Sequence, residues 1–213
     1  SVLITDQRPD HRDFRCVIGV LDRQSKRLWA FKASTVPNAN YVYKCFALAQ
    51  AGTPIANLMG NILPTGCYTY TVGTHRAGQA GEIPTVLRLG TTASNASRVV
   101  VLRSVSDVIY DRFDRFPVAV PADNIHPGQM RAGFSSAGCL TLPGFYAARR
   151  HTGIWNDFRS ASGIHADSNG QQFSLMLLTG LDAALAASVR TGRAGAVDLR
   201  RLRHGSTGAR TAA

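Results

Sequence analysis

A histidine and a cysteine lie thirteen residues apart, each close to a glycine. His126 stands in Asn-Ile-His-Pro-Gly (124–128), and Cys139 ends Ser-Ser-Ala-Gly-Cys (135–139). A cysteine nucleophile needs a base that takes the thiol proton and backbone amides that receive the charge of the attacked carbonyl oxygen. The small residues before Cys139 let backbone and substrate approach closely. The pattern predicts cysteine-based acyl transfer. The alternative is a buried structural thiol and an unrelated loop histidine.

The pair NIHPG and SSAGC resembles the active-site signature of the YkuD-type L,D-transpeptidases. In that family a His-Gly-containing motif precedes Ser/Thr-His-Gly-Cys, and compact variants occur in wall-active phage and effector proteins. The order of histidine before cysteine matches, whereas papain-like peptidases place the cysteine first. Upstream, Leu-Pro-Thr-Gly-Cys-Tyr-Thr-Tyr (63–70) is similar to the family's TPxGxFxI turn and strand. The resemblance can be laid over residues 14–180, with close identity confined to these motifs.

The resemblance implies a role for each matching residue. Cys139 would be the nucleophile and His126 the general base, with the backbone carbonyl of Pro127 orienting the imidazole. The amides of Gly138 and Cys139 would form the oxyanion hole, and Ser136 would hold the loop or contact the substrate. The implied substrate is the peptidoglycan stem peptide, attacked at its diaminopimelate carbonyl without a cofactor. Transpeptidation, L,D-carboxypeptidase activity and D-amino-acid exchange all remain open.

Three positions depart from the family pattern. Ala137 replaces the second histidine, Leu140 replaces a polar residue, and the arginine usual near this position is missing. Recognition of the substrate carboxylate therefore falls to another guanidinium, which can grip a carboxylate with two hydrogen bonds. The candidates are Arg131, Arg149 and Arg150, although isolated arginines of this kind are more commonly ordinary surface charges.

Other candidate site residues carry weaker signals. Trp155 and Phe158 could line a glycan groove, but at helical spacing such residues commonly belong to a core. His165 and Asp167 are a possible metal pair without a third ligand, so the sequence predicts no metal site. The remaining histidines lack metal-ligand spacing and are expected on the surface or in loops: His11, His75, His151 and His204.

The other cysteines show no CxxC spacing, which gives no support to a zinc ribbon or a thioredoxin motif. Cys16 and Cys67 sit inside strand-like patterns and are expected in the core. Cys45 fits no single interpretation. One disulfide among these three stays open if the chain functions outside the cytoplasm.

The elements that must position the His–Cys pair are mostly short strands separated by turn residues, a pattern typical of a β-sandwich or barrel. A hairpin is predicted from 14–20 and 27–33, with further strands at 67–72, 85–89 and 98–103. Helical stretches are predicted around 43–51, 154–160 and 181–189, while 173–178 fits a strand or the start of a helix. Residues 121–144 contain four glycines and three prolines and are predicted to be a loop-rich segment. We expect a mostly-β, YkuD-like β-sandwich with short helices and a C-terminal helix.

Length and charge bound the remaining possibilities. The 213 residues suit one well-buried domain, expected at 1–189, followed by a basic tail at 190–213 that carries six of the 24 basic residues. The net charge of +11 indicates an anionic partner. The alternative to an enzyme is a non-enzymatic basic module that binds nucleic acid or cell wall, although no nucleic-acid recognition motif appears.

No apolar run approaches the ~20 residues of a membrane-spanning helix, and residues 1–15 lack the pattern of a signal peptide. We expect the protein in the periplasm or cell wall, reached by secretion or as part of a larger exported chain. An antibacterial effector with a cognate immunity protein as partner fits this expectation.

Overall fold

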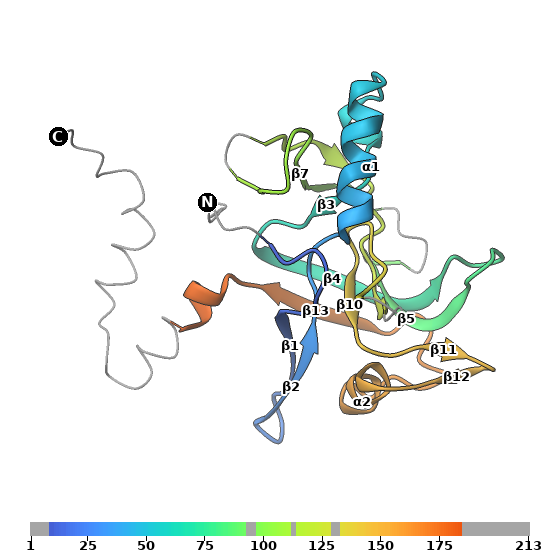
Figure 1. Cartoon of the computed structure of the whole chain (residues 1–213). Coiled ribbons are helices and arrows are strands. Elements are labelled where there is room, and N and C mark those ends of the chain that lie inside the picture. Colours follow the sequence, from blue (N-terminus) through green and yellow to red (C-terminus); the bar gives the residue numbers. More distant parts are fainter. Residues whose placement is uncertain (1–8, 93–96, 112–113, 129–132, 185–213) are drawn as a thin grey trace.

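Residues 9–92, 97–111, 114–128 and 133–184 are described by the computed structural model (Figure 1). Strands dominate these residues and the helices are few and short, which confirms the prediction of a mostly-β fold. Within them, no helix is both long enough and apolar enough to cross a membrane.

The central element is a five-stranded sheet with the order β10-β9-β5-β4-β13. The strands β9 and β10 run parallel, and every other neighbouring pair is antiparallel. The predicted strands at 67–72 and 85–89 are present as β4 and β5, and β13 shows that 173–178 is a strand. The bounds are β4 (Gly66–His75), β5 (Ile83–Leu89), β9 (Ile125–Pro127), β10 (Leu140–Leu142) and β13 (Gln172–Leu177).

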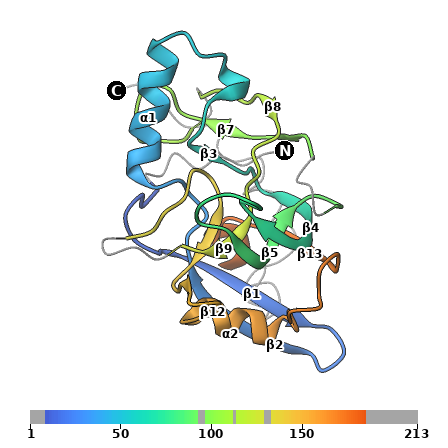
Figure 2. The same cartoon turned by 90° about the vertical axis from the view of Figure 1, so that its right-hand side faces the viewer.

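A hairpin and a helix form a second layer on this sheet (Figures 1 and 2). The hairpin pairs β1 (Cys16–Asp22) with β2 (Arg27–Ala33), as predicted. The helix α2 (Ile154–Ala161) confirms the prediction at 154–160. Ile18 and Ala33 of the hairpin and Phe158 of the helix join the sheet residues in one buried apolar cluster. Burial of this cluster from water is the main force that holds the two layers together.

The upper part of the molecule in Figure 1 contains α1 and several very short strands. The helix α1 (Ala39–Gln50) begins four residues before the predicted stretch, because the side chain of Asn38 accepts the amide of Asn40 as an N-cap. The predicted strand at 98–103 is divided between two ladders. The short elements of this part are η1 (Ile55–Asn57), β3 (Asn61–Ile62), β6 (Val99–Val100), β7 (Leu102–Arg103) and β8 (Val118–Ala119). Two more short strands, β11 (Tyr146–Ala147) and β12 (Arg150–His151), form a hairpin beside α2 in the lower part (Figure 1).

The segments 121–144 and 181–213 differ from their predictions or are only partly described. The segment 121–144 is only partly loop, because it supplies β9 and β10 to the central sheet. Each strand is three residues long, too short for its own alternation to show in the sequence. At the C-terminal end, residues 180–184 are helical. The rest of the predicted helix at 181–189 and the basic tail at 190–213 lie outside the described residues.

All four cysteines are free thiols, so no disulfide forms among Cys16, Cys45 and Cys67, the possibility that the sequence left open. Cys67 is exposed, so its prediction as a core residue is wrong. It lies on the outer face of β4 opposite Met176 of β13, whose side chain is 65% exposed. Cys45 is buried, as is Cys139, and the Sγ of Cys45 donates to the carbonyl of Ser104 at 3.4 Å. Cys16 is half-buried, with its Sγ 3.2 Å from Thr35 Oγ1.

Candidate active site

The parallel pair β9–β10 brings the predicted histidine and cysteine to one face of the sheet. Their register aligns Leu140 with Ile125 and Thr141 with His126. Ile125 and Leu140 enter the apolar core. Because side chains alternate along a strand, His126 and Thr141 lie on the opposite face. Cys139 directly precedes β10, and continuing the alternation places it on the same face as His126.

The imidazole of His126 is oriented by its own strand. Its Nδ1 lies 2.8 Å from the carbonyl oxygen of Pro127, the contact that the sequence motif predicts. A carbonyl oxygen can only accept, so Nδ1 carries the proton and donates it. The lone pair of the neutral ring is then on Nε2. His126 is only 6% exposed and presents this nitrogen as a base within a buried site.

Ser136 closes the turn that leads to Cys139. Its Oγ donates to the carbonyl of Cys139 at 2.7 Å and accepts the amide of Gly138 at 3.0 Å. Ser136 therefore holds the loop, one of its two predicted roles. The same contact engages the Gly138 amide, so the structure does not leave this group free as the predicted oxyanion donor.

The loop rests on a buried polar pair. Asn61 Nδ2 donates to the carboxylate of Asp123, and both side chains are buried. Gly138 has φ of +145°, and a Cβ at this position would collide with both side chains. The carbonyl of Ala137 accepts the amides of Gly60 and Asn61 at 2.9 Å and 3.3 Å. Only glycine allows the backbone before Cys139 to approach this pair so closely.

Burial keeps the side chains of Cys139 and His126 uncharged in the free protein. Burial is the largest effect that raises the pKa of the Cys139 thiol, and the charge of Asp123 is the second; together they raise it to about 12. The amides of Asn124 and Cys139 and the charge of Arg76 lower this pKa by smaller amounts. Burial lowers the pKa of His126 to about 4. At neutral pH both the thiol and the imidazole are therefore uncharged. Cys139 Sγ lies 3.7 Å from the carbonyl of Ala122.

A second histidine, for which the sequence predicts a surface or loop position, belongs to the site. The ring of His75 stacks on His126 with centroids 4.4 Å apart, and its Nδ1 accepts from Asn124 Nδ2 at 2.8 Å. Burial, the His126 ring and Arg76 together lower the pKa of His75 to about 3. His75 ends β4, beyond the predicted strand at 67–72. A predicted strand extended by three residues would have included His75.

The structure also identifies an arginine that the sequence patterns miss. The positive charge of Arg76 lowers the pKa of His75, His126 and Cys139, in each case as a smaller effect than burial. Its guanidinium is thus electrostatically coupled to Cys139 and His126. Nothing in its sequence surroundings marks this position, because it lies at the β4–β5 turn, 50 residues before His126.

The predicted substrate-binding residues lie elsewhere. Trp155 is fully buried in the core and donates from Nε1 to His151 Nδ1 at 2.9 Å, so the prediction that it lines a groove is wrong. The apolar face of α2 must cover the sheet, and this buries the indole. Arg149 is exposed in the turn between β11 and β12. Arg131 lies outside the described residues.

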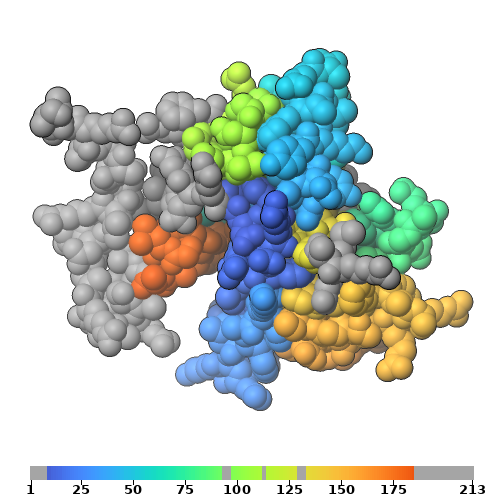
Figure 3. Space-filling model, in the orientation of Figure 1, coloured from blue at the N-terminus to red at the C-terminus, as the bar shows by residue number. Residues whose placement is uncertain are grey.

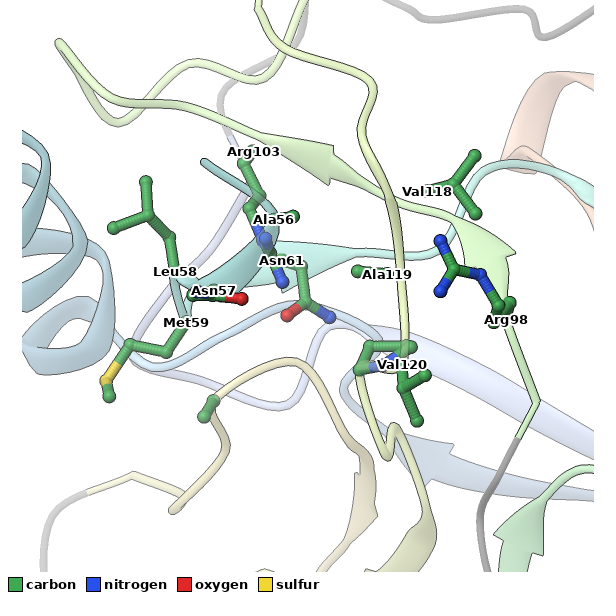
Figure 4. A pocket seen from close by; sticks show the side chains of 12 residues that line it. Ala56, Asn57, Leu58, Met59, Asn61, Arg98, Arg103, Val118, Ala119 and Val120 are labelled. Carbon is green, nitrogen blue, oxygen red and sulfur yellow. The ribbon is translucent and has the colours of Figure 1, made fainter. Parts of the chain in front are cut away.

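A cavity of about 450 Å³ adjoins the Cys139 loop (Figure 4). Its lining includes Asn61, Pro121 and Ala137, which are neighbours of the segments that hold the thiol. Asn61 and Val120 lie between Leu58 and Met59 on one side and Arg98 on the other (Figure 4). Cys139 is not itself among the lining residues, so the cavity borders the Cys139 loop without including the thiol.

Comparisons with protein-family models, with curated proteins and with solved structures give no match for this chain. Among the described residues, no group of three or more His, Cys, Asp or Glu side chains is arranged to hold a metal ion.

Proposed function

We propose that the protein is a cysteine acyltransferase that acts on peptidoglycan stem peptides. One observation carries the proposal: the pairing of β9 with β10, together with strand alternation, puts His126 and the preceding neighbour of β10, Cys139, on one side of the sheet, and the Pro127 carbonyl holds His126 with Nε2 as its basic nitrogen. This arrangement supports nucleophilic catalysis. The choice of stem peptide comes from the resemblance of the NIHPG and SSAGC motifs to L,D-transpeptidases.

The proposed reaction proceeds through a thioester. Cys139 Sγ attacks the carbonyl carbon of the diaminopimelate residue while its proton passes to Nε2 of His126. The C–N bond to the terminal D-Ala then breaks, and the leaving amine takes the proton from His126. An amine acceptor resolves the thioester into a crosslink or an exchanged D-amino acid, whereas water resolves it into a shortened stem. Each route restores the thiol.

The neutral resting pair gives this mechanism a specific feature. Because burial disfavours both the thiolate and the imidazolium, the proton moves as Sγ attacks and not before. A positioned carbonyl is then required for high reactivity. We expect the free thiol to be slow toward small alkylating reagents.

Arginines at the edge of the site suit an anionic substrate. Arg98 is exposed and lines the cavity beside the Cys139 loop. Arg76 is electrostatically coupled to the catalytic pair. The stem peptide carries free carboxylates, and guanidinium groups bind carboxylates with charge-assisted hydrogen bonds. These two residues therefore replace Arg149 as the proposed carboxylate contacts.

The deciding experiment incubates the purified chain with intact sacculi and with soluble tetrapeptide muropeptides, and identifies the products by mass. Crosslinked dimers, shortened stems and exchanged stems distinguish the three fates of the thioester. Cys139→Ala should abolish every product, and Cys67→Ala, which removes the exposed thiol, should retain them. Near-ultraviolet circular dichroism checks that both variants fold. Undiminished turnover by Cys139→Ala, or no product from the unchanged chain, would refute the proposal.

The setting we propose is the periplasm or the cell wall, where the substrate is found. Expression directed to the periplasm should then harm bacterial cells, and expression in the cytoplasm should not. Cys139→Ala directed to the periplasm is the matched control. Rescue by one co-expressed binding protein would identify a cognate immunity partner.

A further inference from the structure

A second cavity lies away from Cys139 and His126, neither of which contributes to it. Its volume is about 540 Å³, and it lies between the start of β5, the β11–β12 hairpin and α2. In Figure 1 the hairpin lies just below β5, and in Figure 3 it projects at the lower right beneath the green β4–β5 turn. The lining residues are Pro84, Thr85, Tyr146, Arg149, Arg150, His151, Asn156, Arg159 and Ala166.

The lining is strongly basic and contains no carboxylate. Arg149, Arg150 and Arg159 contribute three guanidinium groups, and none of them forms an ion pair within the described parts of the chain. The pKa of Arg159 is lowered by burial, with no opposing effect of a nearby carboxylate. Its Nε is buried without a hydrogen-bond partner. Buried donors without partners are costly, and an anion in the cavity would remove this cost.

Thr85 lies at the centre of a hydrogen-bond chain that leaves one donor for a ligand. Trp155 Nε1 donates to His151 Nδ1 at 2.9 Å, so the proton of the neutral imidazole is on Nε2. This nitrogen lies 3.2 Å from Thr85 Oγ1, which also accepts from Arg159 Nη2 at 2.9 Å. The hydroxyl oxygen thus receives two protons from the protein, and its own proton remains for an acceptor.

One non-glycine residue that lines the cavity, Thr85, has a strained backbone. Thr85 has φ of 50°, a conformation that is rare for a β-branched residue. The β4–β5 register places Pro84 and Thr85 together opposite Thr74, which is a β-bulge that redirects the Thr85 side chain. In the β11–β12 turn, Ala148 and Arg149 have φ of 48° and 59°, the geometry that a two-residue hairpin loop favours. Strain such as that at Thr85 is found at ligand-binding sites, where it holds side chains in place.

We propose that this cavity binds a phosphate group, with Arg149, Arg150, Arg159 and the Thr85 hydroxyl as its donors. Three guanidinium charges with no carboxylate in the lining match a doubly charged tetrahedral oxyanion better than a singly charged carboxylate. The phosphate can be free or part of an ester on a small molecule or polymer. The proposal does not rest on the acyltransferase activity, because no residue is shared with the Cys139 site.

The test is isothermal titration calorimetry of the full chain at constant ionic strength. The probes are inorganic phosphate, glycerol 3-phosphate, a glycerol-phosphate oligomer and acetate. We expect saturable binding of one phosphate group per chain, and the tightest probe identifies the free, monoester or diester form. Arg149→Gln should weaken that binding about tenfold, as expected for the loss of one charge-assisted contact. Arg159→Gln should weaken it at least as much.

Arg23→Gln is the control, because it removes one exposed positive charge from the β1–β2 turn. Arg149 is exposed, so Arg149→Gln remains informative even if Arg159→Gln fails to fold. Equal phosphate affinity in the Arg149 and Arg23 variants would overturn the site. Acetate binding as tight as phosphate binding would overturn the ligand class. Cys139→Ala should bind phosphate like the unchanged chain, which separates this test from that of the proposed activity.

Discussion

Asp123 provides the sharpest physical prediction from the site. Its side chain is 1% exposed, and burial raises its pKa from 3.8 to about 7, even though Asn61 and Arg103 act in the opposite direction. A native carboxyl with a raised pKa contributes stability that is complete below pH 3.8 and is lost as the pH rises to about 7. Above that range, the ionised Asp123 destabilises the fold.

The expected magnitude follows from the pKa difference. At ~1.4 kcal/mol per unit, the loss relative to the protonated state is about 1.7 kcal/mol at pH 5 and about 4.4 kcal/mol at pH 8. Asp123→Asn has nearly the same shape and keeps an oxygen for the Asn61 amide, but it cannot ionise. Its free energy of unfolding should therefore rise relative to that of the unchanged chain by about 3 kcal/mol between pH 5 and pH 8.

The assay is urea unfolding of both proteins at pH 5, 6, 7 and 8, followed by intrinsic fluorescence. Contributions of the histidines to the pH dependence cancel in the difference between the two proteins. Asp167→Asn, which removes an exposed carboxylate, should show no comparable pH-dependent gain. A constant difference between Asp123→Asn and the unchanged chain across this range would refute the assignment of a raised pKa to Asp123.

Two further predictions concern the Cys139 loop. With iodoacetamide at pH 8, the exposed Cys67 should be alkylated long before Cys139, because the Cys139 thiol is buried and its pKa is about 12. Peptide mass mapping over time measures the order of modification. Early modification of Cys139 would contradict a neutral buried thiol. Gly138→Ala should destabilise the fold by about 2 kcal/mol or more, because its Cβ meets buried side chains. Thermal unfolding compares Gly138→Ala with Gly163→Ala, because Gly163 has φ of +66° but no atom within 4 Å of an added Cβ. Equal losses of stability in the two variants would show that the close approach of Gly138 to Asn61 and Asp123 is unimportant.

Local patterns in the sequence account for much of the fold. The alternation in 27–33 and the β-branched and aromatic content of 67–72 predict strands that are present as β2 and β4. The contact between His126 and the Pro127 carbonyl involves adjacent residues, so a short motif can anticipate it. These features depend on residues that are neighbours in the chain, and they can therefore be predicted from the sequence.

Contacts between segments that are far apart in the chain could not be predicted from the sequence. His75 meets His126 only because β4, β5 and β9 are neighbours in one sheet. Trp155 is buried because α2 covers the apolar side of that sheet. The positions of these residues follow from long-range strand pairing and packing, and no spacing in the sequence encodes either directly.

By itself, the sequence determined that the chain is mostly β and which histidine and cysteine to examine, because strand propensity and a short motif are local properties. The tertiary structure decided that these two side chains share one face, that burial holds both uncharged, and that Arg76 is coupled to them while Arg149 and Trp155 lie elsewhere. The physical reason is that charge state and proximity depend on what surrounds a side chain in space. That environment is assembled from segments far apart in the sequence.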